Sequence, residues 1–179
     1  MFHFHTFSSL ILAVFVMSAV RAQSSFPTPP VTPQRLFYVQ RSGNTNTIIY
    51  DANTISNGRA FDRKQPILVY WLRYAEQGQV APLNYLQRTL AYGVDVRPKG
   101  TGEYEFNVVS YTKRKLHLLM DTGGRPHAVI HINGKQAWLD HVFVKIEGRK
   151  MTLTPDVRYV ELFGTDPGTG TKVYEKFVP

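Results

Sequence analysis

The sequence predicts an all-β fold, an antiparallel β-sandwich of about ten strands with one helix. Apolar and polar residues alternate with period two along most of the chain, which is typical of strands with one buried face. These runs are short and evenly spaced, and turn-forming residues separate them. Long polar links at 53–65, 75–82 and 165–171 suit crossings between two sheets, and a β-barrel is the alternative.

The expected strands follow one another along the chain, each ended by a turn signal. The first two flank a turn at Ser42-Gly43-Asn44, and Pro66 opens the third. A break in the alternation at Asp140 predicts a bulge in the longest strand. The expected strands are 36–40, 47–52, 67–74, 94–97, 103–111, 115–121, 125–133, 135–147, 157–164 and 172–178.

One helix is expected between Pro82 and Gly93. Proline suits the first turn of a helix, and glycine suits the position after its end. Leu83, Leu86 and Leu90 recur at helical spacing, which predicts one apolar face. We expect this helix to cover an edge or an open end of the sheet.

Residues 1–22 predict a cleaved secretory signal peptide. Residues 10–20 are apolar, and Val20 and Ala22 fit a cleavage site of small residues. The apolar run is too short to cross a bilayer core, which takes about 20 residues. We therefore expect a secreted or periplasmic protein that has no transmembrane segment after signal cleavage.

The mature chain is expected to begin with a proline-rich leader, residues 23–34. A segment with so many prolines is extended and semi-rigid, and we do not expect it to pack as an element of the fold. The single predicted β domain then covers residues 35–179.

Composition and charge exclude several classes of function. The chain has no cysteine, which excludes disulfides, thiolate metal sites and a cysteine nucleophile. Its net charge of +8 favours anionic surfaces, and Lys113-Arg114-Lys115 and Arg149-Lys150 are expected at hairpin tips. The simpler interpretation is a solvated surface whose charges protect strand edges. Export argues against nucleic acid as a partner.

The dipeptide Asn133-Gly134 predicts a two-residue type I′ hairpin, which fixes the pairing of the strands on either side. His127 would then lie opposite Asp140, on a face distinct from the core face. The core face would carry Ala128, Ile130, Ile132, Ala137 and Leu139. The second face would carry His127, Val129, His131, Gln136, Trp138 and Asp140.

That second face is the first candidate site. His127 and Asp140 could form an acid–base couple in catalysis, and His127 and His131 could ligate a metal. His117 or Asp121 would supply a third ligand only if the turn after Asp121 has three residues and a bulge; a two-residue turn would point His117 away. The alternative is an ordinary sheet face that is exposed to water.

The second candidate site combines aromatic rings and arginines at the junction of helix and sheet. Trp71 and Arg73 share a face of one strand, and Arg88 and Tyr92 share a face of the helix. An arginine among aromatic rings can hold a carboxylate, a phosphate or a sugar, so we predict ligand binding by these four residues. The alternative is that the arginines pair with acidic residues and the rings pack in the core.

Six sequence motifs follow one another along the chain: LFYVQRS at 36–42, NTNTIIYDAN at 44–53, VYWLRY at 69–74, YLQR at 85–88, AYG at 91–93 and YVELFG at 159–164. Taken in this order, they resemble a family of exported bacterial proteins, the domain of unknown function numbered 4833. The resemblance extends over nearly all of 35–179 and implies a single domain and export, with no assigned activity, catalytic residue or cofactor.

Three classes of function remain open. The first is a non-catalytic β domain that binds an unknown ligand or envelope partner, favoured by an aromatic content of 13% and by the lack of a nucleophile motif. The second is a hydrolase or metal-dependent enzyme that uses His127, His131 and Asp140. The third is association with polyanions or a membrane surface. The glycine-rich segment 165–171 lacks the lysine of a phosphate loop, and we expect no cofactor.

Overall fold

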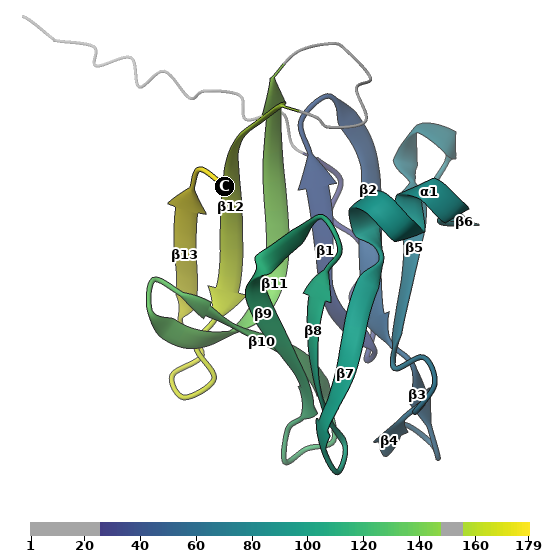
Figure 1. The fold of residues 1–179 in the computed structure, drawn as a ribbon, viewed down its shortest axis with the longest axis vertical. Helices are drawn as coiled ribbons and strands as arrows, with labels where there is room; N and C mark the ends of the chain where they lie inside the picture. The colour runs from purple at the N-terminus through teal and green to yellow at the C-terminus, as the bar shows by residue number, and fades with distance from the viewer. Residues whose placement is uncertain (1–25, 148–155) are drawn as a thin grey trace, which may run out of the picture.

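The computed structural model describes residues 26–147 and 156–179 (Figure 1). The predicted signal peptide and the basic pair Arg149-Lys150 lie outside the described residues. The described chain consists mostly of strands, so the all-β prediction is confirmed. Each of the expected strands is present, and the structure adds three short ones, β3 (Thr54–Ile55), β4 (Ala60–Phe61) and β6 (Gln79–Pro82).

The main sheet has eleven strands and curls into a half-barrel (Figure 1). A separate two-stranded ribbon is formed by β3 and β4. Along its main path the sheet runs β6, β5 (Ile67–Arg73), β2 (Asn44–Ala52), β1 (Arg35–Arg41), β11 (Lys135–Glu147), β10 (Pro126–Ile132), β9 (Tyr111–Met120), β8 (Glu103–Val108) and β7 (Val94–Gly100). On the other side of β11 lies β12 (Asp156–Thr165), followed by β13 (Lys172–Phe177).

The sheet is mixed, so the prediction of a purely antiparallel architecture is wrong. β1 runs parallel to β11, with Tyr38 opposite His141 and Arg41 opposite Val144, whereas the other pairings are antiparallel. Strands joined by a short turn must be antiparallel, but strands far apart in the chain are free to pair in either direction. Periodicity marks a strand without indicating its direction, which is why the sequence did not reveal this pairing.

β11 is the strand at which the sheet branches. Its first part pairs with β10, as in Val129 opposite Trp138, and its second part pairs with β1 along the same edge. β12 follows the opposite edge, and the register between β11 and β12 shifts between Leu139 and His141, which confirms the predicted bulge. Two wings therefore diverge from β11: a first wing of β1, β2, β5 and β6, and a second wing of β10, β9, β8 and β7.

The core lies between these two wings. Phe37 of the first wing stacks on Tyr50 at 4.3 Å between ring centroids and approaches Phe106 of the second wing at 6.4 Å. All three rings are fully buried. Burying a large apolar side chain contributes about 1.5–3 kcal/mol, so this aromatic group is a main source of stability at the place where the wings meet.

The hairpin between β10 and β11 has the predicted turn. Asn133 and Gly134 have φ angles of 49° and 76°, as a type I′ turn requires. Ile132 pairs with Lys135, as predicted. The predicted core face is confirmed as well, because its members are all buried: Ala128, Ile130, Ile132, Ala137 and Leu139.

The helix is shorter than predicted and is not packed by a leucine face. It consists of α1 (Tyr85–Gln87), capped by the side chain of Asn84, and a π-helical turn, Arg88–Tyr92. Leu83 precedes it and is buried, but Leu86 and Leu90 are 57% and 60% exposed. Tyr92 at the end of the helix packs against the core, so the three leucines at helical spacing do not share one environment.

The described part of the leader lies against the convex face of the sheet. The ring of Phe26 is 5.3 Å from that of Phe143, and Pro29 is buried. The buried side chain of Gln40 donates a hydrogen bond from Nε2 to the carbonyl of Pro27 at 2.8 Å. These described residues of the leader are packed against the sheet, which corrects the prediction that the leader does not pack.

Candidate functional site

The concave side of the half-barrel holds a pocket with a volume of about 440 Å³. Its wall is formed mainly by apolar side chains that point inward from β1, β9, β11 and β12, and the end of the helix lies at one side. Phe37 and Val39 of β1, Leu116 of β9 and Leu139 of β11 are buried wall residues. This pocket is the best-formed candidate for a binding site in the described chain.

The pocket exists because the core fills only part of the concave face. Along β11, Leu139 is buried against the second wing, whereas Val142, Val144 and Ile146 further on are only partly buried and line the pocket. Val160 of β12 is likewise only partly buried and lines the pocket. Apolar surface therefore remains accessible inside the fold, and such surface in a concavity is typical of ligand sites.

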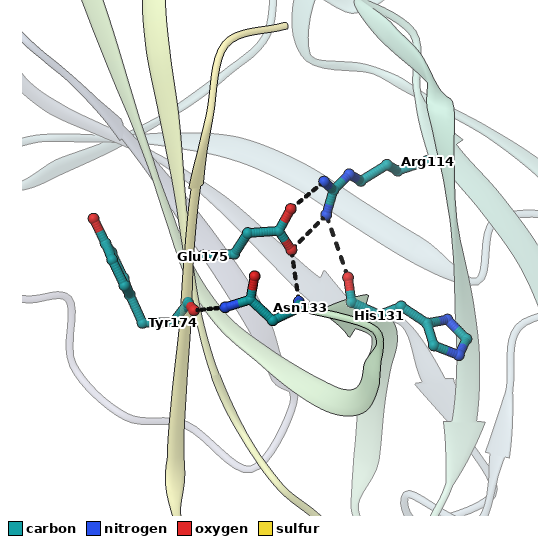
Figure 2. Close-up of polar contacts among 5 residues, drawn as sticks. All are labelled: Arg114, His131, Asn133, Tyr174 and Glu175. Atoms are coloured by element: carbon teal, nitrogen blue, oxygen red, sulfur yellow. Dashed lines mark hydrogen bonds and ion pairs between the residues drawn. The ribbon is translucent and has the colours of Figure 1, made fainter.

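Two arginines and no acidic side chain line the pocket among the described residues. One of them, Arg114 of β9, forms an ion pair with Glu175 of β13, and its guanidinium lies 4.3 Å from the Phe177 ring centre. Figure 2 shows that Glu175 also accepts a hydrogen bond from the backbone amide of Asn133, at 2.8 Å. The charge of Arg114 is thus compensated within the protein.

The second arginine, Arg41 at the end of β1, forms no ion pair with an acidic side chain among the described residues. Its Nη1 donates to the hydroxyl of Tyr92 at 2.7 Å, and its guanidinium carbon lies 5.6 Å from the Trp71 ring centre and 5.9 Å from that of Tyr92. Its Nε is buried without a hydrogen-bond partner among the described residues. Arg41 is therefore a positive charge in a largely apolar pocket, held by aromatic rings.

Tyr92 and its neighbours fix the position of this arginine. The hydroxyl of Tyr50 donates to the carbonyl of Tyr92 at 2.8 Å, and the rings of Trp71 and Tyr92 meet edge to face at 5.3 Å. Burial raises the pKa of the Tyr92 phenol, against the opposite effect of Arg41, so the phenol is neutral at physiological pH. Trp71 is in turn held by a 3.1 Å hydrogen bond from its Nε1 to Gln87.

The structure brings together half of the second predicted site. Trp71 and Tyr92 meet as described, but Arg73 forms an ion pair with Glu76 at 3.0 Å and Arg88 is exposed outside this pocket. The arginine between the rings is Arg41, which the sequence reasoning missed. Its signal was present, because Arg41 continues the inward-facing period that begins with Phe37 and Val39.

The first predicted site is arranged differently from the expected couple. His127 lies 3.0 Å from Asp121, measured from Nε2 to Oδ2, whereas Asp140 accepts hydrogen bonds from Thr165 and Lys172. Asp140 lies where the register between β11 and β12 shifts, and it contacts the β12–β13 side instead of β10. The pairing of His127 with Asp140 is therefore not formed.

The turn after Asp121 has three residues, which is the alternative that placed His117 with the other histidines. The amide of Asp121 donates to the carbonyl of Arg125, and His117 lies opposite Val129. His127 stacks on Trp138 at 3.8 Å, and His131 is exposed.

The carboxyl of Asp121 accepts hydrogen bonds from backbone amides, that of Arg125 first, and from His127, and these bonds lower its pKa. Within the described residues, no three metal-ligating side chains converge.

The basic run at Lys113-Arg114-Lys115 lies within β9 and not at a hairpin tip. Arg114 pairs with Glu175, and Lys115 pairs with Glu105 at 2.6 Å. Two of these three residues therefore have counter-charges: Lys115 from the neighbouring strand β8, and Arg114 from β13, which is not adjacent to β9 in the sheet. No helix in 26–147 or 156–179 is both long and apolar enough to span a membrane.

Comparison with known proteins gives a family without an activity. The model of a family described as a domain of unknown function (DUF4833) matches residues 37–176. No curated protein and no solved structure matches the chain. The pocket and its residues are therefore the basis for a function.

Proposed function

The chain belongs to the DUF4833 family, and since that family carries no assigned activity, we propose from the pocket that this protein is a non-catalytic binding protein for a small, largely apolar molecule. The observation that carries the proposal is the unfilled part of the concave face, where Val142, Val144 and Val160 are accessible to a ligand. Burial of such surface by a ligand is favourable by about 25 cal/mol per Å².

The size and lining of the pocket support this proposal. Small-molecule sites usually enclose about 300–1,000 Å³ and combine an apolar wall with a few polar groups, and this pocket has a volume of about 440 Å³. Its polar side chains include Arg41, Tyr92 and Ser110. No histidine or carboxylate side chain lines the pocket among the described residues, so the groups that usually act as general bases are missing there and binding is favoured over catalysis.

A neutral apolar fluorophore tests the proposal. N-phenyl-1-naphthylamine, titrated with the purified protein, should gain fluorescence and saturate at one molecule per chain. Val160→Trp should weaken its binding by at least about tenfold, because the larger ring occupies the pocket. Tyr159→Trp is the matched control, since Tyr159 is the neighbouring residue on the convex face and is outside the pocket. Equal binding by wild type and Val160→Trp would contradict the proposal.

We further propose that the protein is exported and binds its ligand in the periplasm or outside the cell. The support is the apolar run at 10–20 followed by small residues at Val20 and Ala22. The protein expressed from its full sequence in a bacterium should be recovered outside the cytoplasm with Gln23 at its N-terminus, as measured by mass spectrometry. An uncleaved chain confined to the cytoplasm would refute export and leave the binding proposal intact.

A further inference from the structure

We infer that the ligand of the concave pocket is an anionic amphiphile, an apolar chain with one carboxylate that binds Arg41. The inference rests on the proposed function, because it names the class of molecule that the same pocket takes. Of the two pocket arginines, Arg114 is paired with Glu175, whereas Arg41 forms no ion pair among the described residues. Apolar side chains of β1 and β11 continue from Arg41 along the wall.

No acidic side chain among the described residues forms an ion pair with Arg41. All thirteen acidic residues fall within the described residues, since 1–25 and 148–155 contain none. Several carboxylates of the described residues are paired with other arginines: Asp51 with Arg35, Glu76 with Arg73, Glu147 with Arg158 and Glu175 with Arg114. A partly buried charge without a partner is costly, and a bound anion would remove that cost.

The guanidinium is also free to accept such an anion. Its single hydrogen bond among the described residues goes from Nη1 to the hydroxyl of Tyr92. The other N–H groups of the guanidinium remain available to a ligand. Trp71 and Tyr92 hold the side chain in place, and Trp71 is itself bonded to Gln87 of the capping box. The binding geometry is thus formed before the ligand arrives, which reduces the entropy lost on binding.

The charges of the pocket select a single negative charge. Arg114, the second arginine in the lining, is compensated by Glu175 and does not require a further anion. One planar guanidinium matches one planar carboxylate, whereas a doubly charged phosphate monoester is better served by several cations. The apolar wall beside Arg41 requires the rest of the ligand to be apolar, which gives the class of a long-chain carboxylate.

Displacement of N-phenyl-1-naphthylamine by matched ten-carbon compounds tests the inference. Decanoate should displace the fluorophore at least about tenfold more effectively than decanol, and more effectively than decyl phosphate. Lengthening the chain from octanoate to dodecanoate should tighten binding by up to about fourfold per methylene while the pocket has room. Equal displacement by decanoate and decanol, preference for decyl phosphate, or no dependence on chain length would each overturn the inference.

Substitution of Arg41 identifies the binding group. Arg41→Gln should weaken decanoate binding by about 10- to 150-fold, the range for a hydrogen bond to a charged group, and leave N-phenyl-1-naphthylamine binding unchanged. Arg88→Gln, which removes an exposed arginine outside the pocket, should change neither. The melting temperature of Arg41→Gln should be equal to that of wild type or higher, because an uncompensated charge is removed.

The two proposals fail in different ways. If the fluorophore binds and decanoate binding is unaffected by Arg41→Gln, the carboxylate inference is wrong and the apolar pocket stands. If the fluorophore does not bind wild type, the binding function itself is wrong, whatever the result with decanoate.

Discussion

His141 of β11 is held between two aromatic rings on the convex face of the sheet. Its ring is 4.5 Å from that of Tyr38 and 5.0 Å from that of Phe163, and both pairs are nearly parallel. Its Nε2 is buried without a hydrogen-bond partner among the described residues. Burial lowers the pKa of His141 to about 4, although Asp140 acts in the opposite direction. The imidazole is therefore neutral at pH 7.

This histidine should make the folded protein sensitive to acid. Its folded pKa lies below the ordinary 6.5, so stability is fully present above pH 6.5 and is lost as the pH falls towards 4. His141→Phe should reduce that loss by up to about 3 kcal/mol, measured by urea denaturation at pH 7 and pH 4.5. The exposed His131→Gln should leave the loss unchanged. An equal loss of unfolding free energy between pH 7 and pH 4.5 in wild type and His141→Phe would show that another group is responsible.

The candidate site could be predicted from the sequence only in part, and Arg41 shows why. Trp71 and Tyr92 were identified because aromatic residues in a strand and a nearby helix are local features. The arginine between them comes from β1, two strands away from Trp71 in the sheet. Which side chains meet across three strands depends on the order of the strands, and one sequence does not contain that order in any short-range pattern.

At the scale of elements, β12 lies very close to the hairpin of β10 and β11. A Cβ added to Gly164 would lie 2.6 Å from the carbonyl oxygen of Trp138 and 2.7 Å from Cδ1 of Ile132. Neither neighbour can move easily, since one is backbone and the other is buried. Glycine is therefore required at this position so that β12 can pair closely with β11.

Gly164→Ala should separate β12 from β11 locally. We expect a loss of about 1–3 kcal/mol in the free energy of unfolding, the usual cost of overpacking a core, measured by chemical denaturation. Gly100→Ala in β7 is the matched control, because a Cβ there would have nothing within 4 Å and its φ is not in the left-handed range. An equal, small effect of both substitutions would show that β12 adjusts without cost.

Elements defined by local chemistry were predicted well, and elements defined by distant contacts were not. The hairpin at Asn133-Gly134 was predicted with its register, because the dipeptide determines the turn. The helix was predicted at the right place, but its exposed Leu86 and Leu90 were not, because spacing does not say what covers a face. The parallel pairing of β1 with β11 was missed because period-two alternation indicates neither the direction of a strand nor its partner.

At the scale of the whole molecule, the ion pair of Arg114 and Glu175 closes the curl of the sheet. β9 and β13 are separated in the sheet by β10, β11 and β12, yet the two side chains meet, and Arg114 also donates to the carbonyl of His131. Asn133 adds two hydrogen bonds to this group, one to Glu175 and one to the carbonyl of Tyr174 (Figure 2). The group therefore holds β13 against the second wing at one side of the pocket.

Glu175→Gln should loosen this closure. The substitution leaves Arg114 without its counter-charge, and we expect a loss of about 1–3 kcal/mol in the free energy of unfolding, since both side chains are partly buried. Hydrogen exchange should increase in β13 more than in β2. The double variant Arg114→Gln, Glu175→Gln should be no less stable than Glu175→Gln alone; a further loss equal to that of Arg114→Gln would show that the two residues act independently.

The parallel pairing of β1 with β11 also determines when the sheet can form during protein synthesis. Tyr38 and His141 are paired although they stand at positions 38 and 141 of the chain. A ribosome makes β1, β2 and β5 long before β11 emerges, and until then the outer edge of β1 has no strand beside it. Folding must wait for this late, long-range contact, and pairings of this kind form slowly. The nascent chain therefore remains open for most of its translation, with the edge of β1 exposed to chaperones and to other unfinished chains.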